Sequence, residues 1–379
     1  MNDLKVLMIG SDSKLFVEGS GVSKRIAQYG SIVKELHIVV FTLGSSQFRE
    51  KQIAPNVWLY PTNSISRWLY VYDAIRAGKR LVREHGLEAG EALITTQDSF
   101  ESGLVGLIIK KACHLSLEVQ LHTDPFSRYF RGGLNFLRKM IFKKVLPKAD
   151  HIRVVSSSLK TRVSKFTQAP VSVLPIYVEG TLARDAEEVL NLHKLFGWDF
   201  VVLSIARLTQ EKNLSLALEV IGEVRKMNKN VGLVIVGDGP EKERLKSLAK
   251  KLGMEDFVSF EGWKEDVSSY YRSSDLFIQT SLYEGYGMAL IEAGLHDLPI
   301  VSTPVGVATE FENGRDLYTC QAEDFVVWVN TVSNLIKDVQ KRDFLKENMK
   351  KALKENLLSQ EEFMNRLLEG WQKTVKNKK

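Results

Sequence analysis

The chain has 379 residues, of which 44% are hydrophobic and 26% are charged, and its formal net charge at pH 7 is +6. This composition excludes an intrinsically disordered protein, and the length exceeds what one ordinary hydrophobic core fills, so we expect two domains. Two cysteines, Cys113 and Cys320, are too few for a disulfide framework or a thiolate metal site, which indicates a reducing, cytoplasmic location. We expect neither a signal peptide nor a membrane-spanning helix, because no apolar run has the required length.

Positive charge is concentrated in the first half of the chain. Residues 1–178 contain 25 Lys and Arg against 14 Asp and Glu, a net of +11, whereas the remainder contains 27 against 32, a net of −5. Either the two halves meet different partners, or solvated surface charge is simply uneven.

Short apolar runs alternate with amphipathic helical patterns, which is typical of parallel α/β sheets. In the first half we predict strands at Lys5–Ile9, Leu36–Phe41, Val57–Tyr60, Ala92–Thr96, Leu117–His122, His151–Val155 and Val171–Leu174. The helices predicted in this half are Gly21–Lys34, Arg67–Glu84, Ser99–Ala112, Leu134–Leu146 and Leu159–Phe166.

A charged stretch from Glu179 to Lys194 interrupts this pattern before a second series of elements begins. The strands predicted there are Phe200–Ala206, Val231–Gly237, Val258–Glu261, Leu276–Thr280 and Pro299–Ser302. The helices are Asn213–Lys226, Pro240–Leu252, Val267–Ser273, Gly287–His296, Glu323–Val339, Arg342–Lys354 and Ser359–Val375. The interruption predicts an N-terminal domain of residues 1–178 and a second domain from residue 179. We expect the Lys-rich end of the chain to be a frayed tail.

The most informative segment is Ser281–Ala293. It places Glu284 in a Gly-rich turn and Glu292 eight residues later in an apolar helix, while Arg207 and Lys212 follow a buried strand upstream. Two cations near two carboxylates can hold a molecule with an anionic middle and hydroxylated ends, and a nucleotide diphosphate sugar is such a molecule.

The two cations have a plausible anion-binding geometry. Ligands of open parallel sheets bind beyond the carboxyl ends of the strands, where Arg207 lies, and Lys212 follows in the loop. Asn213 is expected to cap the next helix, whose free N–H groups favour an anion. The alternative is that both cations are ordinary surface residues.

The glutamates suit separate hydroxyl groups better than one shared bond. If the interval is mostly helical, eight residues span ~12 Å, whereas a hydrolytic carboxylate pair lies ~5–9.5 Å apart. Gly285 and Gly287 let the backbone approach a ligand. The alternative is a helix N-terminus with an acidic first turn.

Three features of the first half are less specific. Gly19 and Gly21 form a Gly-rich loop before a basic helix, which suits a phosphate or substrate but equally suits a tight turn. His122, at a strand end, is suited to hydrogen-bonding a sugar hydroxyl or moving a proton, or is structural. The helix Leu134–Leu146 is basic and amphipathic, so its apolar face either docks on an anionic membrane or packs in the domain core.

Together these residues resemble the retaining glycosyltransferases of family 4, within glycosyl transferases group 1, whose architecture of two Rossmann-like domains is known as GT-B. The resemblance covers nearly the whole chain. It is carried mainly by Ile205–Leu208 with Glu211–Asn213, Ile235–Pro240, Phe260–Trp263, the two glutamates, Val301–Gly306 and Glu310.

The resemblance implies an α/β fold with a donor-binding domain at residues 179–355, and a C-terminal helix and tail, residues 356–379, that return to the N-terminal domain. It implies transfer of a sugar from a UDP- or GDP-linked donor to a saccharide or lipid-linked acceptor in glycan or cell-envelope polysaccharide synthesis. It also implies that no cofactor or metal is bound. The absence of an Asp-x-Asp motif at a strand end agrees with this, since Arg207 and Lys212 can replace a divalent ion.

Individual roles follow from the resemblance. Arg207 and Lys212 would bind the donor diphosphate, Glu292 the ribose, and Glu284 the donor sugar, while His122 would line the reaction centre. Gly19 and Gly21 would leave room for a substrate. The other donor-binding positions implied are Gly237, Gly262, Trp263, Gly285, Tyr286 and Gly287.

Some features leave alternatives open. Ala293–Pro299 and Val307–Ala308 depart from the usual family pattern beside the sugar and base pocket, which leaves the donor undetermined. A nucleotide-sugar 2-epimerase of the same fold and a non-catalytic nucleotide-sugar-binding protein are the competing interpretations. A nucleic-acid partner is not expected, because the basic residues are not interleaved with aromatic stacking platforms.

Overall fold

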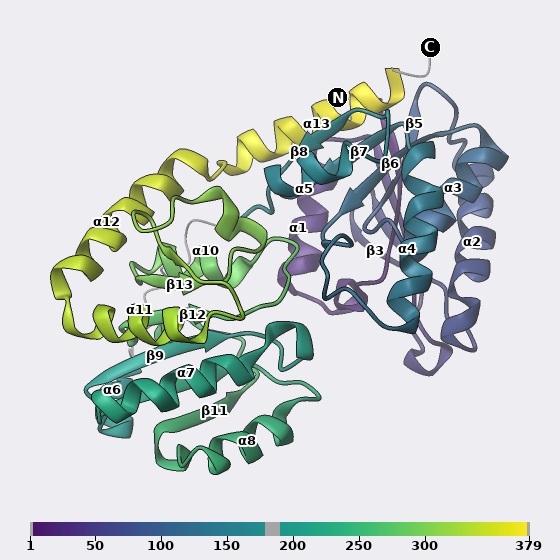
Figure 1. Ribbon diagram of the computed structural model, residues 1–379. Helices are drawn as coiled ribbons and strands as arrows, with labels where there is room; N and C mark the ends of the chain where they lie inside the picture. The colour runs from purple at the N-terminus through teal and green to yellow at the C-terminus, as the bar shows by residue number, and fades with distance from the viewer. Residues whose placement is uncertain (1–2, 179–189, 377–379) are drawn as a thin grey trace. The chain divides into compact units, whose positions relative to one another are not determined.

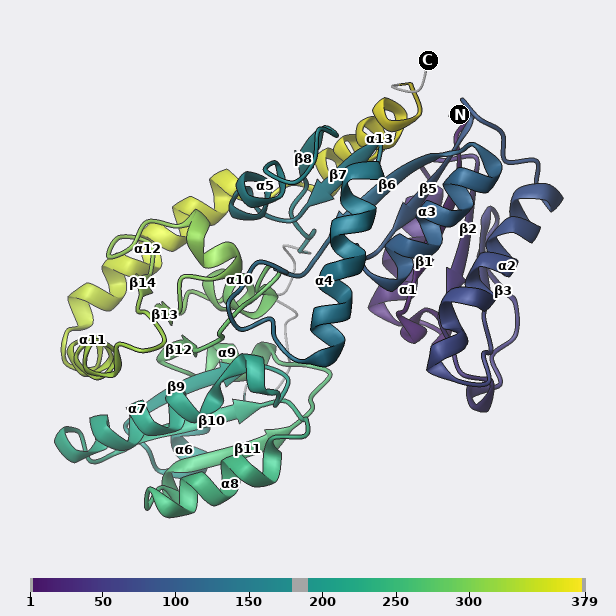
Figure 2. The same cartoon turned by 45° about the vertical axis from the view of Figure 1, so that its right-hand side comes forward.

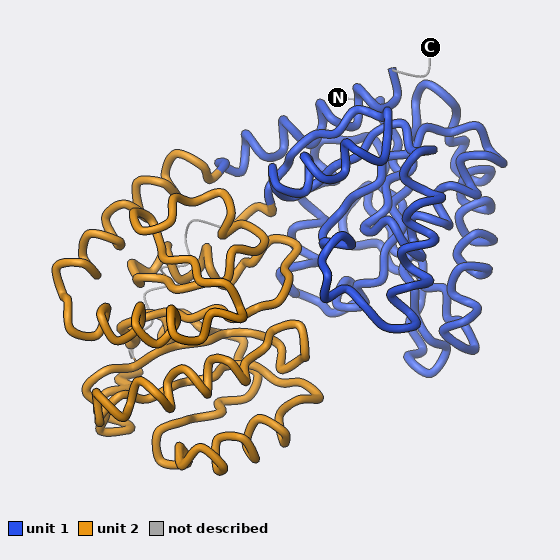
Figure 3. The backbone as a smooth tube through the Cα atoms, in the orientation of Figure 1, with its two compact units in different colours: residues 1–175, 358–379 blue, residues 176–357 orange. Residues whose placement is uncertain are grey.

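The computed structural model describes residues 3–178 and 190–376, which form two compact units (Figure 1). Unit 1 comprises residues 1–175 and 358–379, and unit 2 comprises residues 176–357 (Figure 3). The sequence placed the boundaries at 178/179 and 355/356. Most of the charged stretch that suggested the first boundary, residues 179–189, lies outside the described residues.

Within the described part of unit 1, eight strands form one sheet in the order β3-β4-β2-β1-β5-β6-β7-β8. Neighbouring strands are parallel, apart from β3, which runs antiparallel to β4. The strands are β1 (Lys5–Gly10), β2 (Glu35–Val40), β3 (Lys51–Ala54), β4 (Val57–Pro61), β5 (Ala92–Thr96), β6 (Ser116–Leu121), β7 (His151–Val154) and β8 (Val171–Val173).

Helices cover both faces of this sheet (Figure 2). One face carries three helices in succession, α2 (Tyr70–Glu84), α3 (Glu101–Cys113) and α4 (Gly133–Val145). On the other face, α1 (Gly21–Gly30) and α13 (Gln360–Lys376) meet where the ring of Tyr29 contacts Phe363 and Trp371. The short helix α5 (Ser157–Val163) precedes β8.

The last helix belongs to unit 1, which confirms the predicted return of the C-terminal helix to the N-terminal domain. Trp371 is fully buried and donates its indole N–H to the Glu118 carboxylate of β6 at 3.1 Å. Lys373 and Lys376, which we expected in a frayed tail, lie in the helix instead. Lys378 and Lys379 lie outside the described residues.

In the described part of unit 2, six parallel strands form a second sheet in the order β11-β10-β9-β12-β13-β14. These strands are β9 (Phe200–Ile205), β10 (Val231–Val236), β11 (Val258–Gly262), β12 (Leu276–Gln279), β13 (Ile300–Ser302) and β14 (Tyr318–Thr319). The helices are α6 (Leu192–Phe196), α7 (Leu214–Met227), α8 (Lys242–Lys251), α9 (Ser268–Arg272), α10 (Met288–Leu295), α11 (Phe325–Lys337) and α12 (Val339–Asn356).

The predicted fold class, two α/β units with parallel sheets, is confirmed. Among the described strands and α-helices, three short elements were not predicted: β3, β14 and α6. The edge strand β3 has two polar residues followed by two apolar ones, and β14 has only two residues, so neither has the long apolar run of a central strand. The predicted helix Arg67–Glu84 is divided into a 3₁₀ turn at Arg67–Leu69 and α2.

Candidate functional site

Unit 2 gathers most of the predicted donor-binding residues at one edge of its sheet. The strands β11, β10, β9 and β12 are parallel neighbours, so their carboxyl ends share an edge. Arg207 and Lys212 follow β9, Gly237 follows β10, Gly262 ends β11, and Glu284 follows β12. Residues far apart in sequence therefore meet in one region.

The centre of this region is an ion pair between Lys212 and Glu284. The Lys212 ammonium lies 2.5 Å from Oε1 of Glu284, and the side chains are 16% and 11% exposed. The Ser281 hydroxyl donates to the same carboxylate oxygen at 2.7 Å. Two donors on one oxygen fix the carboxylate, and the carboxylate in turn fixes the direction of the lysine.

Backbone hydrogen bonds hold the two loops that carry this pair. The Leu282 N–H donates to the Glu211 carbonyl at 2.7 Å. The Thr280 hydroxyl lies 3.1 Å from the carbonyl of Lys212 and 3.0 Å from that of Asn213. The loop after β9 and the loop after β12 are thus one connected structure, and the pair is preorganised.

In the loop after β9, Asn213 differs from what the sequence predicted, and Arg207 is mostly exposed. Asn213 occupies the position before α7, but it adopts a left-handed conformation (φ 50°) and its side chain makes no capping hydrogen bond, so the predicted cap is wrong. Asparagine is one of the residues that tolerates this conformation. Arg207 is 77% exposed, and its guanidinium lies 3.6 Å from Glu211, so it shares a loop with Lys212 but not the Lys212–Glu284 pair.

The turn from Gly285 to Gly287 leads directly into α10. Gly287 has φ 103°, a backbone conformation that favours glycine. Tyr286 is buried, and burial, followed by the charge of Glu310, raises the pKa of its phenol to about 12. Because α10 begins at Met288, the interval between Glu284 and Glu292 is helical only in its second half, so the ~12 Å estimate for a mostly helical interval applies to that half alone.

Glu292 is fixed by a tyrosine from a neighbouring helix. The Tyr271 hydroxyl donates to Oε2 of Glu292 at 2.9 Å and lies 3.1 Å from the Ala289 carbonyl. Burial raises the pKa of Glu292, and the hydrogen bond from Tyr271 opposes this effect. The carboxyl group is therefore oriented through one of its oxygens, Oε2.

The remaining donor-side positions are at the ends of β10 and β11. Gly237 has φ 137°, and a Cβ there would lie 1.9 Å from the Ala206 carbonyl oxygen, so only glycine fits. Its N–H donates to the Gly262 carbonyl at 2.8 Å. Trp263 follows and is 65% exposed. Gly237 thus lets the ends of three strands approach one another.

In unit 1, Gly19 and Gly21 flank the start of α1. Ser20 caps this helix, because its hydroxyl accepts a hydrogen bond from the Ser23 N–H at 3.2 Å. No described heavy atom lies within 4 Å of a Cβ built at either glycine. A Cβ at either position would therefore meet open space.

His122 ends a chain of hydrogen bonds that begins in the core of unit 1. Its Nε2 lies 2.9 Å from the Gln120 side-chain oxygen, the Gln120 amide donates to the Thr95 hydroxyl at 2.8 Å, and Thr95 donates to Glu118 at 3.0 Å. An ionised carboxylate only accepts, so the single Thr95 proton points to Glu118 and Thr95 accepts from Gln120. The Gln120 oxygen then faces His122.

This order fixes the tautomer of His122: Nε2 carries the hydrogen, and Nδ1 is the acceptor. The ordinary pKa of an imidazole, about 6.5, already leaves an exposed histidine such as His122 mostly neutral at pH 7. Desolvation, followed by the positive charges of Arg153 and Arg25, shifts the pKa of His122 in the same direction. The imidazole is therefore neutral at pH 7 and presents one unprotonated nitrogen.

The buried polar network that orients His122 was not predicted from the sequence. Glu118 is fully buried and also contacts His151 Nδ1 at 3.0 Å and Arg153 Nε at 3.5 Å. Desolvation alone would raise the pKa of Glu118, but Arg153, His151 and Thr95 lower it overall. A signal was present, since Glu118, Gln120 and His122 alternate along an otherwise apolar strand.

A comparison with protein families matches part of the chain. Residues 187–352 match the family model of glycosyl transferases group 1.

Some proteins similar to this chain have names that state an activity. The chain is 25% identical over 256 residues to the alpha-monoglucosyldiacylglycerol synthase of Streptococcus pneumoniae, covering 62% of this chain and 55% of the relative. It is 23% identical over 370 residues to the N-acetyl-alpha-D-glucosaminyl L-malate synthase of Bacillus anthracis, covering 93% of each. The matches span less than two thirds of the length of several curated relatives.

Solved structures resemble the fold of nearly the whole chain. The crystal structure of Anabaena HepE in complex with UDP and glucose matches with a TM-score of 0.75 and 18% identity, covering 97% of this chain and 98% of HepE. The chain therefore has the GT-B fold that its sequence predicted.

Proposed function

We propose that this protein transfers a sugar, with retention, from a nucleotide diphosphate sugar to a saccharide or lipid-linked acceptor. The observation that carries the proposal is the Lys212–Glu284 pair, held at 2.5 Å where the parallel strands of a group 1 glycosyltransferase domain end. A cation and a carboxylate fixed side by side suit a donor whose diphosphate and sugar are adjacent.

The cations would act on the leaving diphosphate. The Lys212 ammonium has three N–H groups and gives one to Glu284, so the others are available to phosphate oxygens. Arg207, exposed on the same loop, would close a bidentate contact when it exchanges Glu211 for phosphate. Together they would stabilise the charge that develops on the diphosphate, in the role that a divalent ion has in metal-dependent enzymes.

The carboxylates would hold hydroxyl groups. The hydrogen bonds that Glu284 accepts from described side chains both use Oε1, which leaves Oε2 to accept from the donor sugar. Glu292, oriented through Oε2 by Tyr271, would use Oε1 for the ribose. His122 would accept a proton or hydrogen bond through Nδ1, and the open space at Gly19 and Gly21 would admit substrate.

A lipid-linked acceptor is supported by exposed apolar side chains in unit 1. The C-terminal half of α4 packs inward through Phe142 and Val145, whereas its N-terminal half exposes Leu134, Leu137, Met140 and Phe136, the last by 67%. Just before α2, Trp68 is 86% exposed. Both helices start at the edge where the parallel strands of unit 1 end, and Figure 2 shows these starts on the same side.

Charge complements this apolar surface. Arg131, Lys143 and Lys144 are exposed on or beside α4, and the first half of the chain is basic. Lysine and arginine near an anionic bilayer contribute about 1 kcal/mol each. The pneumococcal relative is named for a diacylglycerol product, which agrees with an acceptor presented at a membrane. Among the described residues, no helix has the length and apolarity that crossing a bilayer requires.

Membrane contact is tested by sedimentation with phosphatidylglycerol vesicles at low salt. We expect binding, and we expect Phe136→Ser and Trp68→Ser each to weaken it by at least about tenfold, because a buried aromatic side chain contributes about 1.5–3 kcal/mol. Val326→Ser, at an equally exposed apolar residue of unit 2, is the control and should change nothing. Vesicle binding that is equal in all four proteins would reject the surface.

Transfer itself is tested with purified protein, a panel of UDP- and GDP-sugars, and saccharide or lipid acceptors. We expect Lys212→Ala to lower kcat by about 10²–10³-fold, the loss usual for one preorganised donor to a developing anion. Lys226→Ala, on the exposed surface of α7, is the matched control. A Lys212→Ala protein with full activity would end the assignment, and a donor epimer formed without acceptor would indicate an epimerase instead.

A further inference from the structure

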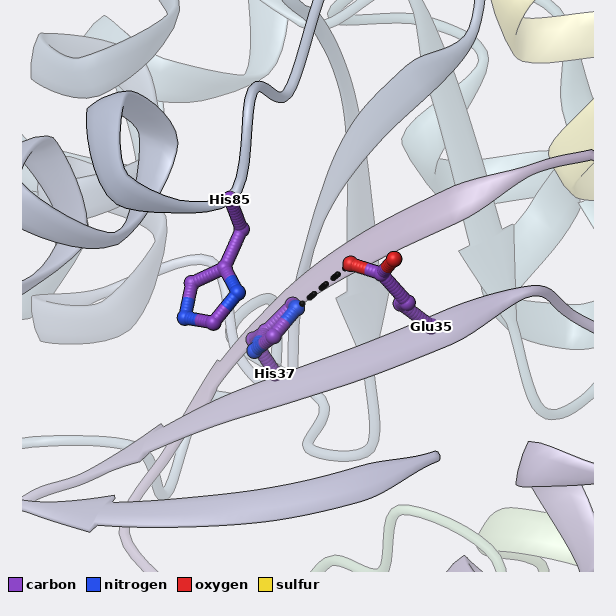
Figure 4. A group of neighbouring side chains, drawn as sticks. All are labelled: Glu35, His37 and His85. Atoms are coloured by element: carbon purple, nitrogen blue, oxygen red, sulfur yellow. Dashed lines mark hydrogen bonds and ion pairs between the residues drawn. The ribbon is translucent and has the colours of Figure 1, made fainter. Parts of the chain in front are cut away.

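A group of polar side chains in unit 1 has no part in the proposed transfer. Within the described ranges, Glu35, His37 and His85 each offer one ligand atom, and these atoms all lie within 4.8 Å of one another. Figure 4 shows the carboxylate of Glu35 and one ring nitrogen of His85 both facing His37. Two imidazoles and a carboxylate form a ligand set that divalent transition ions prefer.

Regular structure places these three residues together. Glu35 and His37 are two positions apart on β2, so their side chains leave the same face of the strand. His85 is the residue that ends α2, a helix that packs on β2. Its ring lies 4.0 Å from that of His37, centroid to centroid. Two of the three candidate ligands are thus fixed on a central strand of the sheet, and the third lies at a helix end.

A second layer of contacts orients the histidines. The Tyr60 hydroxyl lies 3.1 Å from Nδ1 of His37 and 3.4 Å from Nε2 of His85. When His37 donates from Nδ1 to Tyr60, its Nε2 lone pair points toward Glu35, whose Oε2 is 3.2 Å away. Histidine ligands of metals commonly donate their other ring N–H to such a partner.

We propose that Glu35, His37 and His85 bind a divalent transition ion of the zinc type, with water as a further ligand. Nitrogen ligands disfavour Mg²⁺ and Ca²⁺, which take oxygen. Ligand bonds of about 2.0–2.1 Å place tetrahedral ligand atoms about 3.3 Å apart. The pair from Glu35 and His37 already has this separation, so closure requires His85, which is partly exposed, to move by about 1.5 Å at most.

One neighbouring cation leaves room for the ion. The Lys5 ammonium lies 3.5 Å from Oε1 of Glu35 and donates to the His85 carbonyl at 2.7 Å. It therefore faces the carboxylate oxygen that does not face His37. Glu35 begins β2, at the opposite edge from the strand ends that precede His122, so the ion would stabilise unit 1 and would not act in sugar transfer.

The test is calorimetric titration of the full chain, freed of metal with a chelator, with ZnCl₂. We expect one ion per chain and at least about tenfold weaker binding in His85→Ala, because even indirect partners of metal ligands contribute that much. Tyr60→Phe, which keeps the ring and removes the hydroxyl, should weaken binding by about tenfold. His37 is not substituted, because it is fully buried and its loss endangers folding.

The matched control is His114→Asn, an exposed histidine with φ 57° that asparagine tolerates. It should bind Zn²⁺ like the wild type. Failure of the wild type to take up Zn²⁺, or equal affinity in His85→Ala, overturns the site. The rate of sugar transfer should be the same with and without Zn²⁺. The zinc titration therefore tests this site, and the transfer assay tests the proposed function independently.

Discussion

Glu118→Gln tests the polar network that joins α13 to the sheet of unit 1. The carboxylate is fully buried and accepts from Thr95, Trp371 and His151, with Arg153 3.5 Å away. Glutamine has nearly the same shape but no charge, so Arg153 loses its counter-ion inside the protein. Removing one partner of a buried ion pair costs about 3–5 kcal/mol. For a unit of about 200 residues this lowers Tm by about 6–20 °C.

The loss should be confined to unit 1 and should depend on pH in a defined way. Hydrogen exchange followed by mass spectrometry should show faster exchange in β5, β6 and α13, and unchanged exchange in β9 and β10. The pKa of Glu118 is lowered in the folded protein, so its contribution is fully present above the ordinary glutamate pKa and is lost as pH falls through the folded value. The difference in stability between the two proteins should therefore shrink in acid.

The same substitution tests the tautomer of His122. With glutamine at position 118, Thr95 is no longer required to donate to it, and the orientation of Gln120 is released. We expect ¹⁵N NMR to show His122 with mixed tautomers, and transfer to fall by about 10²-fold or more, while nucleotide binding to unit 2 is retained. Glu101→Gln, which breaks the partly exposed pair with Arg138, is the control and should cost about 1 kcal/mol or less. If Glu118→Gln is no more harmful than this control, the buried carboxylate does not anchor α13.

Three further outcomes are expected. Gly237→Ala should destabilise unit 2 strongly, because the new Cβ meets the Ala206 carbonyl at 1.9 Å, whereas Gly21→Ala should leave Tm within about 1 °C; equal melting curves would refute the packing argument. Tyr271→Phe removes the hydrogen bond that orients the Glu292 carboxylate, so calorimetry should show weaker nucleotide affinity. Because this hydrogen bond holds the pKa of Glu292 down, the loss of affinity in acid should begin at higher pH in Tyr271→Phe, and an unshifted profile would count against Glu292 as a ligand. The preferred nucleotide sugar should raise the thermal stability of unit 2 by about 2.7 kcal/mol at a hundred times its Kd, and a panel without any stabilising member would count against donor binding.

The sequence pattern was sufficient to predict the features that depend on residues close together in the chain. Each central strand is a run of apolar residues followed by an amphipathic helix, so the strand cores and the order of elements were predictable. The meeting of Lys212 with Glu284 was also within reach, because parallel strands end at a common edge. Their direct pairing was not predicted, since sequence order does not say which loop residues turn toward each other.

Contacts across long sequence separations were not predictable from one sequence. Trp371 donates to Glu118 across 253 positions, and the sequence around either residue does not indicate the other as its partner. The same holds for His85 and Glu35, which α2 and β2 bring together. The sequence left the exposure of Arg207 open for a different reason: its motif identifies the loop, while the direction of the side chain depends on Glu211.

Because α13 belongs to unit 1, that unit is assembled from both ends of the chain. A ribosome delivers residues 1–175 first, then all of unit 2, and only then the helix that carries Trp371. Until that helix emerges, the nascent sheet lacks the cover over Glu118 and Tyr29, whereas unit 2 is contiguous and can complete its own core earlier. Synthesis of unit 1 thus begins first, but its folding is completed last. Chains that stop before Trp371 should therefore be recognised by chaperones and proteases.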